Sequence, residues 1–469
     1  MLAVIILCIT AFGFIYLNHV NNAMYNVPEE ARRLSPHRWT VDEIKAAYKK
    51  AVHNPIDVTK SLPPKQGRRY VVVGGSGLVG NWIISHLVAR GEDPAAIRAL
   101  DLQPPRRELL DLGVTFVKTN IVDEVAVQSA FSQPWPSRVA DLSLTVFHNA
   151  AMIRPADRHK AFLPLVRKVN VGGTNNVLNV AKAAGASCFI STSSGSVCMR
   201  RPIFWIPPWT KTPRHAVQVL SDETELPKEY DEFFGTYPVS KLEAETLVRA
   251  ADDIKNNFRT GCIRPANGIS GVGSESSATI IGLYLKMGSG PTWLHPIIQN
   301  LVNAENVSIA HLLYEQRLIE HTASPSTLPN IGGDAFIVTD PNPAISFGDL
   351  YLLMTTLATT PILFPYVPPV PMLILSHFVE WYALLRHFCF PWLPEVTGDL
   401  NRLQPAVFAI SNPHLIVDDS RARKDPQDGG LGYKPPLTSL DGACKELLHW
   451  NRLAAEKGAA AIMGKVRPY

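Results

Sequence analysis

The sequence is poor in the features of a disulfide-bonded or metal-binding protein. It has six cysteines in 469 residues, all far apart. It lacks a C-x-x-C pair, and no histidine stands at metal-ligand spacing from a cysteine. These absences argue against structural zinc and against a disulfide framework. We therefore expect a reduced, cytosol-facing protein with no metal site.

A strong charge of either sign is also missing. The formal net charge is +4 at pH 7, which is too weak and too dispersed to predict nucleic-acid binding. Because 46% of the residues are hydrophobic, the chain can bury a large core and is globular rather than disordered. Residues 21–69 are locally basic, with ten Lys and Arg against five acids.

The first twenty residues contain no charged side chain. The apolar run from Leu2 to Leu17 is close to the lower limit of about 17 residues for crossing a bilayer. We favour a membrane anchor over a cleaved signal peptide, because a basic n-region and an A-x-A-like cleavage site are missing. The basic residues that follow then place the rest of the chain in the cytosol. Residues 40–52 begin with a capping box, Thr40 with Glu43, and predict an amphipathic helix that lies on the membrane or is simply solvated.

Three evenly spaced glycines separate a predicted strand from a predicted helix. Residues 70–73 are β-formers, and helical periodicity begins at residue 78. Between and beyond them, Gly74, Gly77 and Gly80 follow G-x-x-G-x-x-G, whose missing side chains let the backbone approach a pyrophosphate at the helix N-terminus. A second strand ends in Asp101, near the offset of about 20 residues expected for the acid that binds the ribose. Together these features predict a Rossmann dinucleotide site.

The strand end also bears on the choice of cofactor. Asp101 favours NAD, because a carboxylate accepts hydrogen bonds from ribose hydroxyls and repels a 2′-phosphate. Arg106 and Arg107 would suit that phosphate, but Pro104 and Pro105 direct them away from the strand end. NADP stays the less favoured alternative.

Two later segments carry side chains suited to proton transfer. Residues 187–197 predict a strand that ends in hydroxyls, Ser194 among them, and Tyr237 and Lys241 stand four residues apart on one helical face. Lys241, with the positive nicotinamide ring, would lower the pKa of the phenol, so that Tyr237 accepts a proton near neutrality. Ser194 would hydrogen-bond the same substrate oxygen. Y-x-x-x-K is common by chance and gains weight here from the dinucleotide fingerprint upstream.

With these motifs the sequence resembles the extended short-chain dehydrogenase/reductases, and within them the 3β-hydroxysteroid dehydrogenase and sterol-4α-carboxylate 3-dehydrogenase group. The resemblance covers roughly residues 69–450. It is carried by the segments GGSGLVG, VFHNAA, VNVGGTNNVL, STSSGSV, YPVSK, IRPANGISG, NVSIAHL and LGYKPPLTSLDG. It implies an α/β fold, in which a doubly wound parallel Rossmann sheet is joined to a mostly helical C-terminal substrate region and an N-terminal membrane anchor helix.

The resemblance also implies site residues. Ser194, Tyr237 and Lys241 match the catalytic positions, and Asn170 matches a helix residue that supports them. Asn120 departs from the aspartate usual near the adenine, although an amide still hydrogen-bonds there. The full set expected to bind the cofactor is Gly74, Gly77, Leu78, Val79, Gly80, Asp101, Asn120, Ile121, Ala150, Ala151, Tyr237, Lys241 and Pro265. We expect His148, beside this set, to be a packed histidine.

Two hydrophobic segments suggest how the substrate region meets a lipophilic ligand. Residues 200–215 are basic and aromatic, which suits a membrane interface or a pocket mouth, although an ordinary surface insertion has the same composition. Prolines divide residues 350–392 into two short helices, which we expect to form a hairpin over the substrate site. A second membrane span is disfavoured by Glu380 and Arg386. The expected parts are an anchor (1–20), a basic linker with an amphipathic helix (21–67), a Rossmann domain (68–260) and a substrate region (261–469).

The expected activity is NAD(P)-dependent oxidation of the 3β-hydroxyl of a sterol, steroid or triterpenoid, in its favoured form with loss of a 4-carboxyl group. The expected partners are this lipophilic polycyclic substrate and the endoplasmic reticulum membrane, with the catalytic part in the cytosol and no nucleic acid. A homodimer, or association with other membrane-bound sterol-modifying enzymes, stays open. The alternatives are a dehydrogenase for another lipophilic alcohol or a nucleotide sugar, and a non-catalytic NAD-sensing scaffold.

Overall fold

A seven-stranded parallel sheet forms the centre of the protein, whose computed structural model describes residues 1–273, 279–324 and 327–464. The strand order is β11-β7-β5-β4-β1-β2-β3. The order reverses between β1 and β4, so their carboxyl ends open the crevice where such sheets bind ligands. The strands are β1 (Arg69–Val73), β2 (Ile97–Asp101), β3 (Thr115–Lys118), β4 (Leu144–His148), β5 (Ala186–Thr192), β7 (Arg259–Pro265) and β11 (Ala335–Val338).

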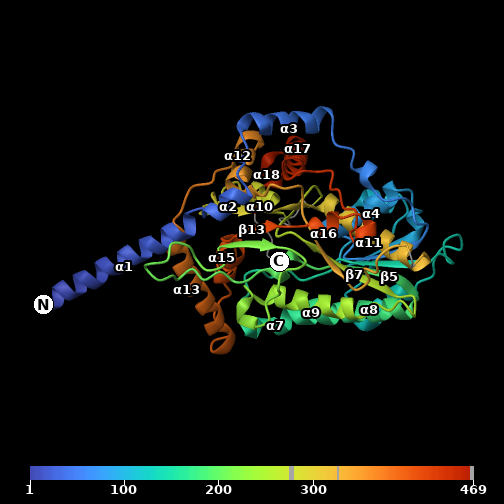
Figure 1. Ribbon diagram of the computed structural model, residues 1–469, viewed down its shortest axis with the longest axis horizontal. Coiled ribbons are helices and arrows are strands. Elements are labelled where there is room, and N and C mark those ends of the chain that lie inside the picture. The colour runs from blue at the N-terminus through green and yellow to red at the C-terminus, as the bar shows by residue number, and fades with distance from the viewer. Residues whose placement is uncertain (274–278, 325–326, 465–469) are drawn as a thin grey trace.

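Helices cover both faces of this sheet, as the predicted doubly wound fold requires. In Figure 1, α8 and α9 run below the sheet, and α4 and α11 lie together above it. The helices around the sheet are α4 (Leu78–Ala89), α5 (Arg107–Asp111), α6 (Glu124–Ser132), α7 (Leu163–Arg167), α8 (Thr174–Ala183), α9 (Thr236–Ala250) and α11 (Ala304–Ala323). A wide π-helical turn, Lys168–Gly173, joins α7 to α8. Short 3-10 turns are Val58–Ser61, Pro94–Ala96, Lys160–Phe162, Gly195–Cys198, Tyr230–Glu232 and Pro426–Asp428.

The second half of the chain, together with one strand from residues 217–220, adds a smaller body beside the carboxyl edge of the sheet. It contains a four-stranded sheet, β12-β9-β13-β6, and a two-stranded one, β10-β8. The strands are β6 (Val217–Leu220), β8 (Ile269–Ser270), β9 (Ile298–Gln299), β10 (Val302–Asn303), β12 (Ile345–Ser346) and β13 (His414–Val417). The helices are α10 (Ile280–Met287), α12 (Phe347–Leu357), α13 (Pro369–Phe388), α14 (Asp399–Arg402), α15 (Pro405–Ser411), α16 (Ser420–Arg423), α17 (Ser439–Lys457) and α18 (Ala459–Ile462). The expected boundary at residues 260/261 falls inside β7, and β11 also belongs to the large sheet, so the chain returns to the Rossmann sheet after entering the substrate region.

The N-terminal segment consists of α1 (Leu2–Tyr25), α2 (Glu29–Leu34) and α3 (Val41–His53). Within the described residues, one helical stretch, at the N-terminus, is long and apolar enough to cross a membrane, and α1 projects from the body in Figure 1. The Thr40–Glu43 capping box forms. However, the apolar face of α3 packs on α12 and α17 with Ile44 fully buried, so this face is covered by the protein and not by solvent.

The hydrophobic stretch 350–392 contains two helical segments, as predicted, but they do not form an exposed hairpin. The helix α12 is mostly buried between α3 and α17, with Leu350, Leu353 and Met354 in the core. Only α13 keeps large apolar side chains exposed. Periodicity indicates that a helix has an apolar face, but not which partner covers it.

A buried ion pair fixes α9 beneath the carboxyl edge of the sheet. Arg264 on β7 donates from Nε to Glu245 Oε2 at 2.9 Å and from Nη2 to Glu245 Oε1. The Ser193 hydroxyl donates to the same carboxylate at 2.5 Å. Burial opposes the charge of Glu245, but the hydrogen bonds and charge of Arg264, the Ser193 hydroxyl and the charge of Arg249 together outweigh burial and lower its pKa. The pair therefore joins α9, the end of β5 and β7.

We predict that Glu245→Ala lowers the free energy of unfolding by about 3–5 kcal/mol, because Arg264 stays buried without its partner. The matched control on the same helix is Glu243→Ala, which breaks a more exposed pair with Arg167 and should cost less than about 1 kcal/mol. Urea unfolding followed by tryptophan fluorescence measures both variants. Equal losses in the two would contradict the prediction.

Candidate active site

The predicted glycine turn lies between β1 and α4, close to the loop after β4. Gly74 has φ +75°, and a side chain there would meet Ala150 N at 2.5 Å. A Cβ on Gly80 would stand 2.1 Å from Gly74 O, so the helix can approach the turn only without one. Gly77 caps α4, and the first turn of an α-helix leaves its N–H groups without intrahelical partners. These N–H groups, from Leu78 and Val79 among others, form an anion cradle at the crevice.

Asp101 closes the other side of this turn. Its carboxylate accepts hydrogen bonds from Ser76 N at 3.0 Å and Leu102 N at 2.7 Å. Two backbone donors leave lone pairs free for ribose hydroxyls. The Arg106 guanidinium stacks 4.7 Å from the Trp82 ring centre, and Arg107 is exposed. Both arginines line one cavity with Ser76 and Gly77 of the turn. The turn and the carboxylate fit an adenosine ribose and a pyrophosphate.

Tyr237 and Lys241 both lie on α9, facing the end of β5. Lys241 Nζ donates to Thr192 O at 2.7 Å, which ties the helix to that strand. Burial lowers the pKa of Lys241 to about 8. Burial also raises the pKa of Tyr237 to about 12, although the Ser194 hydroxyl acts in the opposite direction. The lowered phenol pKa expected from Lys241 is therefore not present in the protein alone, because burial outweighs the nearby polar groups.

Ser194 begins the turn that follows β5. Its Oγ accepts from Ser196 N at 3.2 Å and lies 2.8 Å from Ser196 Oγ, while its neighbour Ser193 bonds Glu245 on α9. The two adjacent hydroxyls thus have different partners. Ser193 connects the end of β5 to α9 through Glu245, and Ser194 lies beside the Tyr237 phenol.

Asn170 lies in the π-helical turn and is almost fully buried. Its Oδ1 accepts from Met152 N at 2.7 Å, and its Nδ2 donates to Met152 O and to Ser240 Oγ, each at 3.0 Å. Ser240 stands directly before Lys241 on α9. The amide therefore joins the loop after β4 to α9, and wide helical turns of this kind occur frequently at functional sites.

The remaining predicted residues lie around the same edge, at different distances from the catalytic group. Pro265 ends β7, and its carbonyl oxygen stands 2.9 Å from where a Gly195 side chain would begin. Ile121 packs against Gly173. Asn120 is exposed after β3, which β1 and β2 separate from β4, and its Oδ1 accepts from Val122 N at 3.1 Å. This position is compatible with an adenine contact and remote from Tyr237.

Sequence reasoning missed a polar chain behind Lys241. Thr192 Oγ1 lies 2.5 Å from Asn149 Oδ1 and 2.8 Å from His311 Nε2. Burial lowers the pKa of His311 to about 4, and its Nδ1 lies 2.8 Å from Val307 O, so the neutral ring donates its one N–H to that carbonyl. The segments HNAA and SIAHL contained these residues, but nothing local in the sequence pairs them. His148 is a packed histidine, buried with its Nε2 2.9 Å from Thr174 Oγ1.

A mainly apolar cavity of about 440 Å³ opens next to α9. Its walls come from the loop 153–157, α10, residues 291–294, and the segment 398–411. Asp157 in this wall accepts from Thr236 N at 2.9 Å, one residue before Tyr237. Ser194, Tyr237 and Lys241 do not line this cavity, and the backbone bond at Thr236 links its wall to the first turn of α9.

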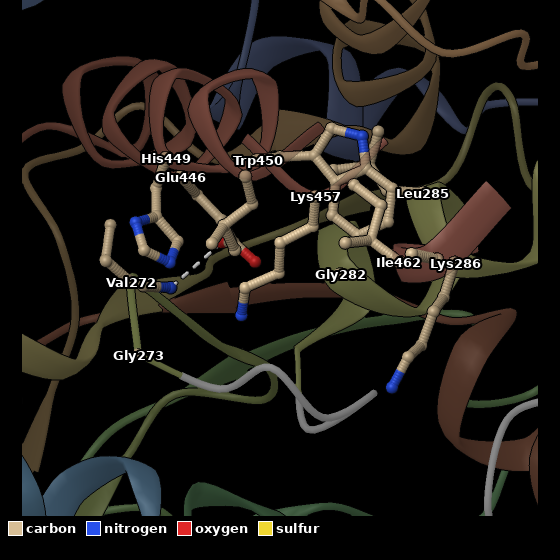
Figure 2. A pocket seen from close by; sticks show the side chains of 13 residues that line it. Val272, Gly273, Gly282, Leu285, Lys286, Glu446, His449, Trp450, Lys457 and Ile462 are labelled. Atoms are coloured by element: carbon tan, nitrogen blue, oxygen red, sulfur yellow. Dashed lines mark hydrogen bonds between the residues drawn. The ribbon is translucent and has the colours of Figure 1, made fainter. Parts of the chain in front are cut away.

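Figure 2 shows a second, smaller cavity of about 190 Å³ between α10 and α17. Glu446 projects into it beside His449 and Trp450. Its Oε2 accepts from Gly271 N at 3.0 Å, and its Oε1 accepts from Thr279 Oγ1. Burial raises the pKa of Glu446 to about 7. The hydrogen bonds of Glu446 join α17 to residues 271 and 279, so we treat Glu446 as a structural group.

Comparison with known proteins identifies the family to which this chain belongs. The profile of the 3-beta hydroxysteroid dehydrogenase/isomerase family matches residues 71–360. The chain is 25% identical to a bovine (Bos taurus) sterol-4-alpha-carboxylate 3-dehydrogenase, decarboxylating, over 84% of this chain and 96% of the relative. It is 26% identical to mouse (Mus musculus) 3 beta-hydroxysteroid dehydrogenase type 7, over 83% and 97%. The fold matches a UDP-glucose-4-epimerase of Stenotrophomonas maltophila solved with NAD, with a TM-score of 0.56, 14% identity, and 83% and 99% coverage.

We predict that Glu446→Gln stabilises the protein at pH 8 but not at pH 5. Because the folded pKa of about 7 exceeds the usual 4.5, the wild-type protein loses stability as pH rises between these values. A neutral amide removes that loss, which amounts to at most about 3 kcal/mol. Thermal unfolding at the two pH values measures it, and a difference independent of pH would contradict the prediction.

Proposed function

Because this chain belongs to the 3-beta hydroxysteroid dehydrogenase/isomerase family, a family of oxidoreductases, we propose that it oxidises the 3β-hydroxyl of a sterol, steroid or triterpenoid to the 3-ketone, with NAD as oxidant. One observation carries the proposal. The loop 153–157, whose Asp157 carbonyl accepts from Thr236 N next to Tyr237, forms a wall of an apolar cavity that takes a polycyclic lipid more readily than a charged substrate. A non-catalytic scaffold has no need of a lysine buried beside a tyrosine.

In this mechanism the substrate hydroxyl lies between Ser194 and Tyr237. Tyr237 accepts its proton, Ser194 donates a hydrogen bond to the substrate oxygen, and the nicotinamide supplies the hydride acceptor. Lys241, held by Thr192 O, stays mostly protonated below its pKa of about 8 and favours the phenolate electrostatically. The glycine turn and Asp101 would hold the pyrophosphate and the ribose, with Asn120, Ile121, Ala150, Ala151 and Pro265 completing the cofactor site.

We favour the decarboxylating form of this reaction, which the names of several relatives suggest. A carboxyl group on C4 becomes part of a β-keto acid once C3 is a ketone. The bond from C4 to the carboxyl carbon then breaks, carbon dioxide leaves, and the electron pair forms an enolate. The Ser194 and Tyr237 hydroxyls are suited to stabilise the enolate oxygen before C4 is protonated.

We further propose that α1 is a single-pass anchor in the endoplasmic reticulum membrane and that the rest of the chain lies in the cytosol. Its length and exposed apolar surface support the anchor. The basic linker (21–67), the Rossmann part (from 68) and the substrate region (from 261) follow it, with the last two sharing β7.

The first test is turnover of 3β-hydroxysterols with and without a 4-carboxyl group, by detergent-solubilised full-length protein. We expect NADH and carbon dioxide together from the carboxylated sterols. Tyr237→Phe should lower kcat about 10²- to 10⁴-fold, since it removes the proton acceptor, and leave NAD affinity unchanged. Tyr48→Phe, on α3 far from the site, is the matched control. If no sterol is turned over although NAD still binds, the sterol assignment is refuted. NADH formation without carbon dioxide would refute decarboxylation.

The cofactor assignment has its own test in Asp101→Asn. The amide can still accept from Ser76 N but no longer repels a 2′-phosphate, so the preference for NAD over NADP in kcat/KM should fall about tenfold, the equivalent of 1.4 kcal/mol. Asp111→Asn, on the nearby surface helix α5, should not change the ratio. A wild-type protein that prefers NADP would overturn the assignment.

A further inference from the structure

The helix α13 has the reverse of the usual polarity of a surface helix. Four large apolar side chains on one of its sides, here called the apolar stripe, are exposed: Leu375 (42%), Phe378 (64%), Trp381 (62%) and Phe388 (61%). Phe390 and Trp392, just beyond the helix, are also exposed. A helix of a soluble domain normally carries polar and charged residues on its solvent side. Contiguous exposed apolar surface marks a site of interaction.

The acidic side chain of α13 is turned inward. Glu380 is 7% exposed and accepts from Arg158 Nε at 2.9 Å. Arg386 is partly exposed and donates from Nε to the Leu393 carbonyl at 2.9 Å, in the segment that follows the helix. None of the four residues of the apolar stripe is charged, and Glu380 has its ionic partner on the side facing the protein.

The position of α1 identifies a bilayer as the occupant of this surface. Val370 N donates to Asn21 Oδ1 at 3.3 Å, and the rings of Tyr25 and Tyr366 meet edge to face at 5.1 Å, so α13 begins beside the base of α1. Figure 1 shows the two helices together at that end of the molecule. From Val20 onward, α1 packs against the rest of the protein, with Val20, Ala23 and Met24 buried. Its projecting part, residues 2–17, is about 24 Å long, against a hydrocarbon core of about 30 Å. So short a span brings the protein body, and α13 with it, down to the lipid headgroups.

The same helix adjoins the apolar cavity. Phe388 and His387 contact His159 and Phe162 at ring distances of 5.8 and 5.3 Å, in the loop that continues from cavity wall 153–157. The wall segment 398–411 follows α13 in the chain, and α15 packs against it. Two walls of the cavity are thus continuous with the apolar stripe.

We propose that the apolar stripe of α13 lies in the membrane interface and that a lipophilic substrate passes from the bilayer along α13 into the cavity. The location of α13 stands on the contacts above, and the passage of substrate rests on the proposed function. An interfacial helix of this kind lies in the plane of the headgroups without crossing the bilayer.

A probe on Cys389 tests the location. This cysteine is exposed at the end of α13, and Cys8 is the other exposed one, while the remaining four are buried. Full-length protein carrying Cys8→Ser is labelled at Cys389 with an NBD fluorophore and reconstituted into phosphatidylcholine vesicles. We expect blue-shifted emission that doxyl-labelled lipid quenches and iodide does not. Iodide quenching with α1 inserted would overturn the location. Shielding that depends on protein concentration in detergent, rather than on lipid, would assign the apolar stripe to a protein partner and also overturn it.

A paired variant tests the route. Phe378→Asp should make the probe accessible to iodide and lower kcat/KM for sterol presented in vesicles about tenfold, the order expected for losing the burial of one large apolar side chain. With sterol in detergent micelles kcat/KM should not change. Val125→Asp, at another exposed apolar position, on α6, should change neither value. Equal loss in vesicles and micelles would overturn the route. A lipid-quenched probe with no turnover of any sterol would support the location and count against the proposed function alone.

Discussion

The Glu245–Arg264 ion pair is the constraint on which the geometry of the site depends. Glu245 lies one turn of α9 beyond Lys241, Arg264 directly precedes Pro265, and the carboxylate also holds Ser193, the neighbour of Ser194. Three segments that each contribute a site residue thus meet at one buried carboxylate. Removing a carboxylate from water is costly. That desolvation cost is offset here because the hydrogen bonds to Glu245 come from a charged donor, Arg264, and from a hydroxyl, Ser193. The rotation of α9, and with it the direction of Tyr237, follows from that pair and from the Lys241–Thr192 bond.

Much of this arrangement follows from local sequence. The glycine spacing, the acid at the end of β2, the hydroxyls at the end of β5 and the four-residue spacing of Tyr237 and Lys241 each describe one turn of chain. In a parallel sheet the carboxyl ends of the strands share an edge, so correct strands bring these residues together. The partners across the fold are different in kind. His311 contacts Thr192 from 119 residues away in the sequence. The sequence around either residue does not predict this contact.

The same limit applies to the packing of the hydrophobic segments, because local sequence does not show which part of the fold covers them. The α3 helix has the basic, amphipathic pattern of a membrane-surface helix, yet α12 and α17 cover its apolar face. In the sequence, α12 and α13 belong to one hydrophobic stretch. In the structure α12 is part of the core, whereas α13 keeps large apolar side chains exposed. Glu380 and Arg386 counted against a second membrane span. The Glu380 carboxylate is paired with Arg158 on the protein side, and Arg386 bonds the Leu393 carbonyl just beyond the helix, so neither charge belongs to the apolar stripe.

The two central titrating groups point to an order of events under the proposed function. Burial acts on Tyr237 and Lys241 in opposite directions, raising the pKa of the phenol to about 12 and lowering that of the ammonium to about 8. Both shifts favour the neutral forms, so the protein alone holds a phenol that is a weak proton acceptor at pH 7. Proton acceptance by Tyr237 therefore needs an additional positive charge close by, which an oxidised nicotinamide ring provides. It follows that substrate deprotonation is coupled to occupancy by the oxidised cofactor, because desolvation around Tyr237 would otherwise disfavour the phenolate.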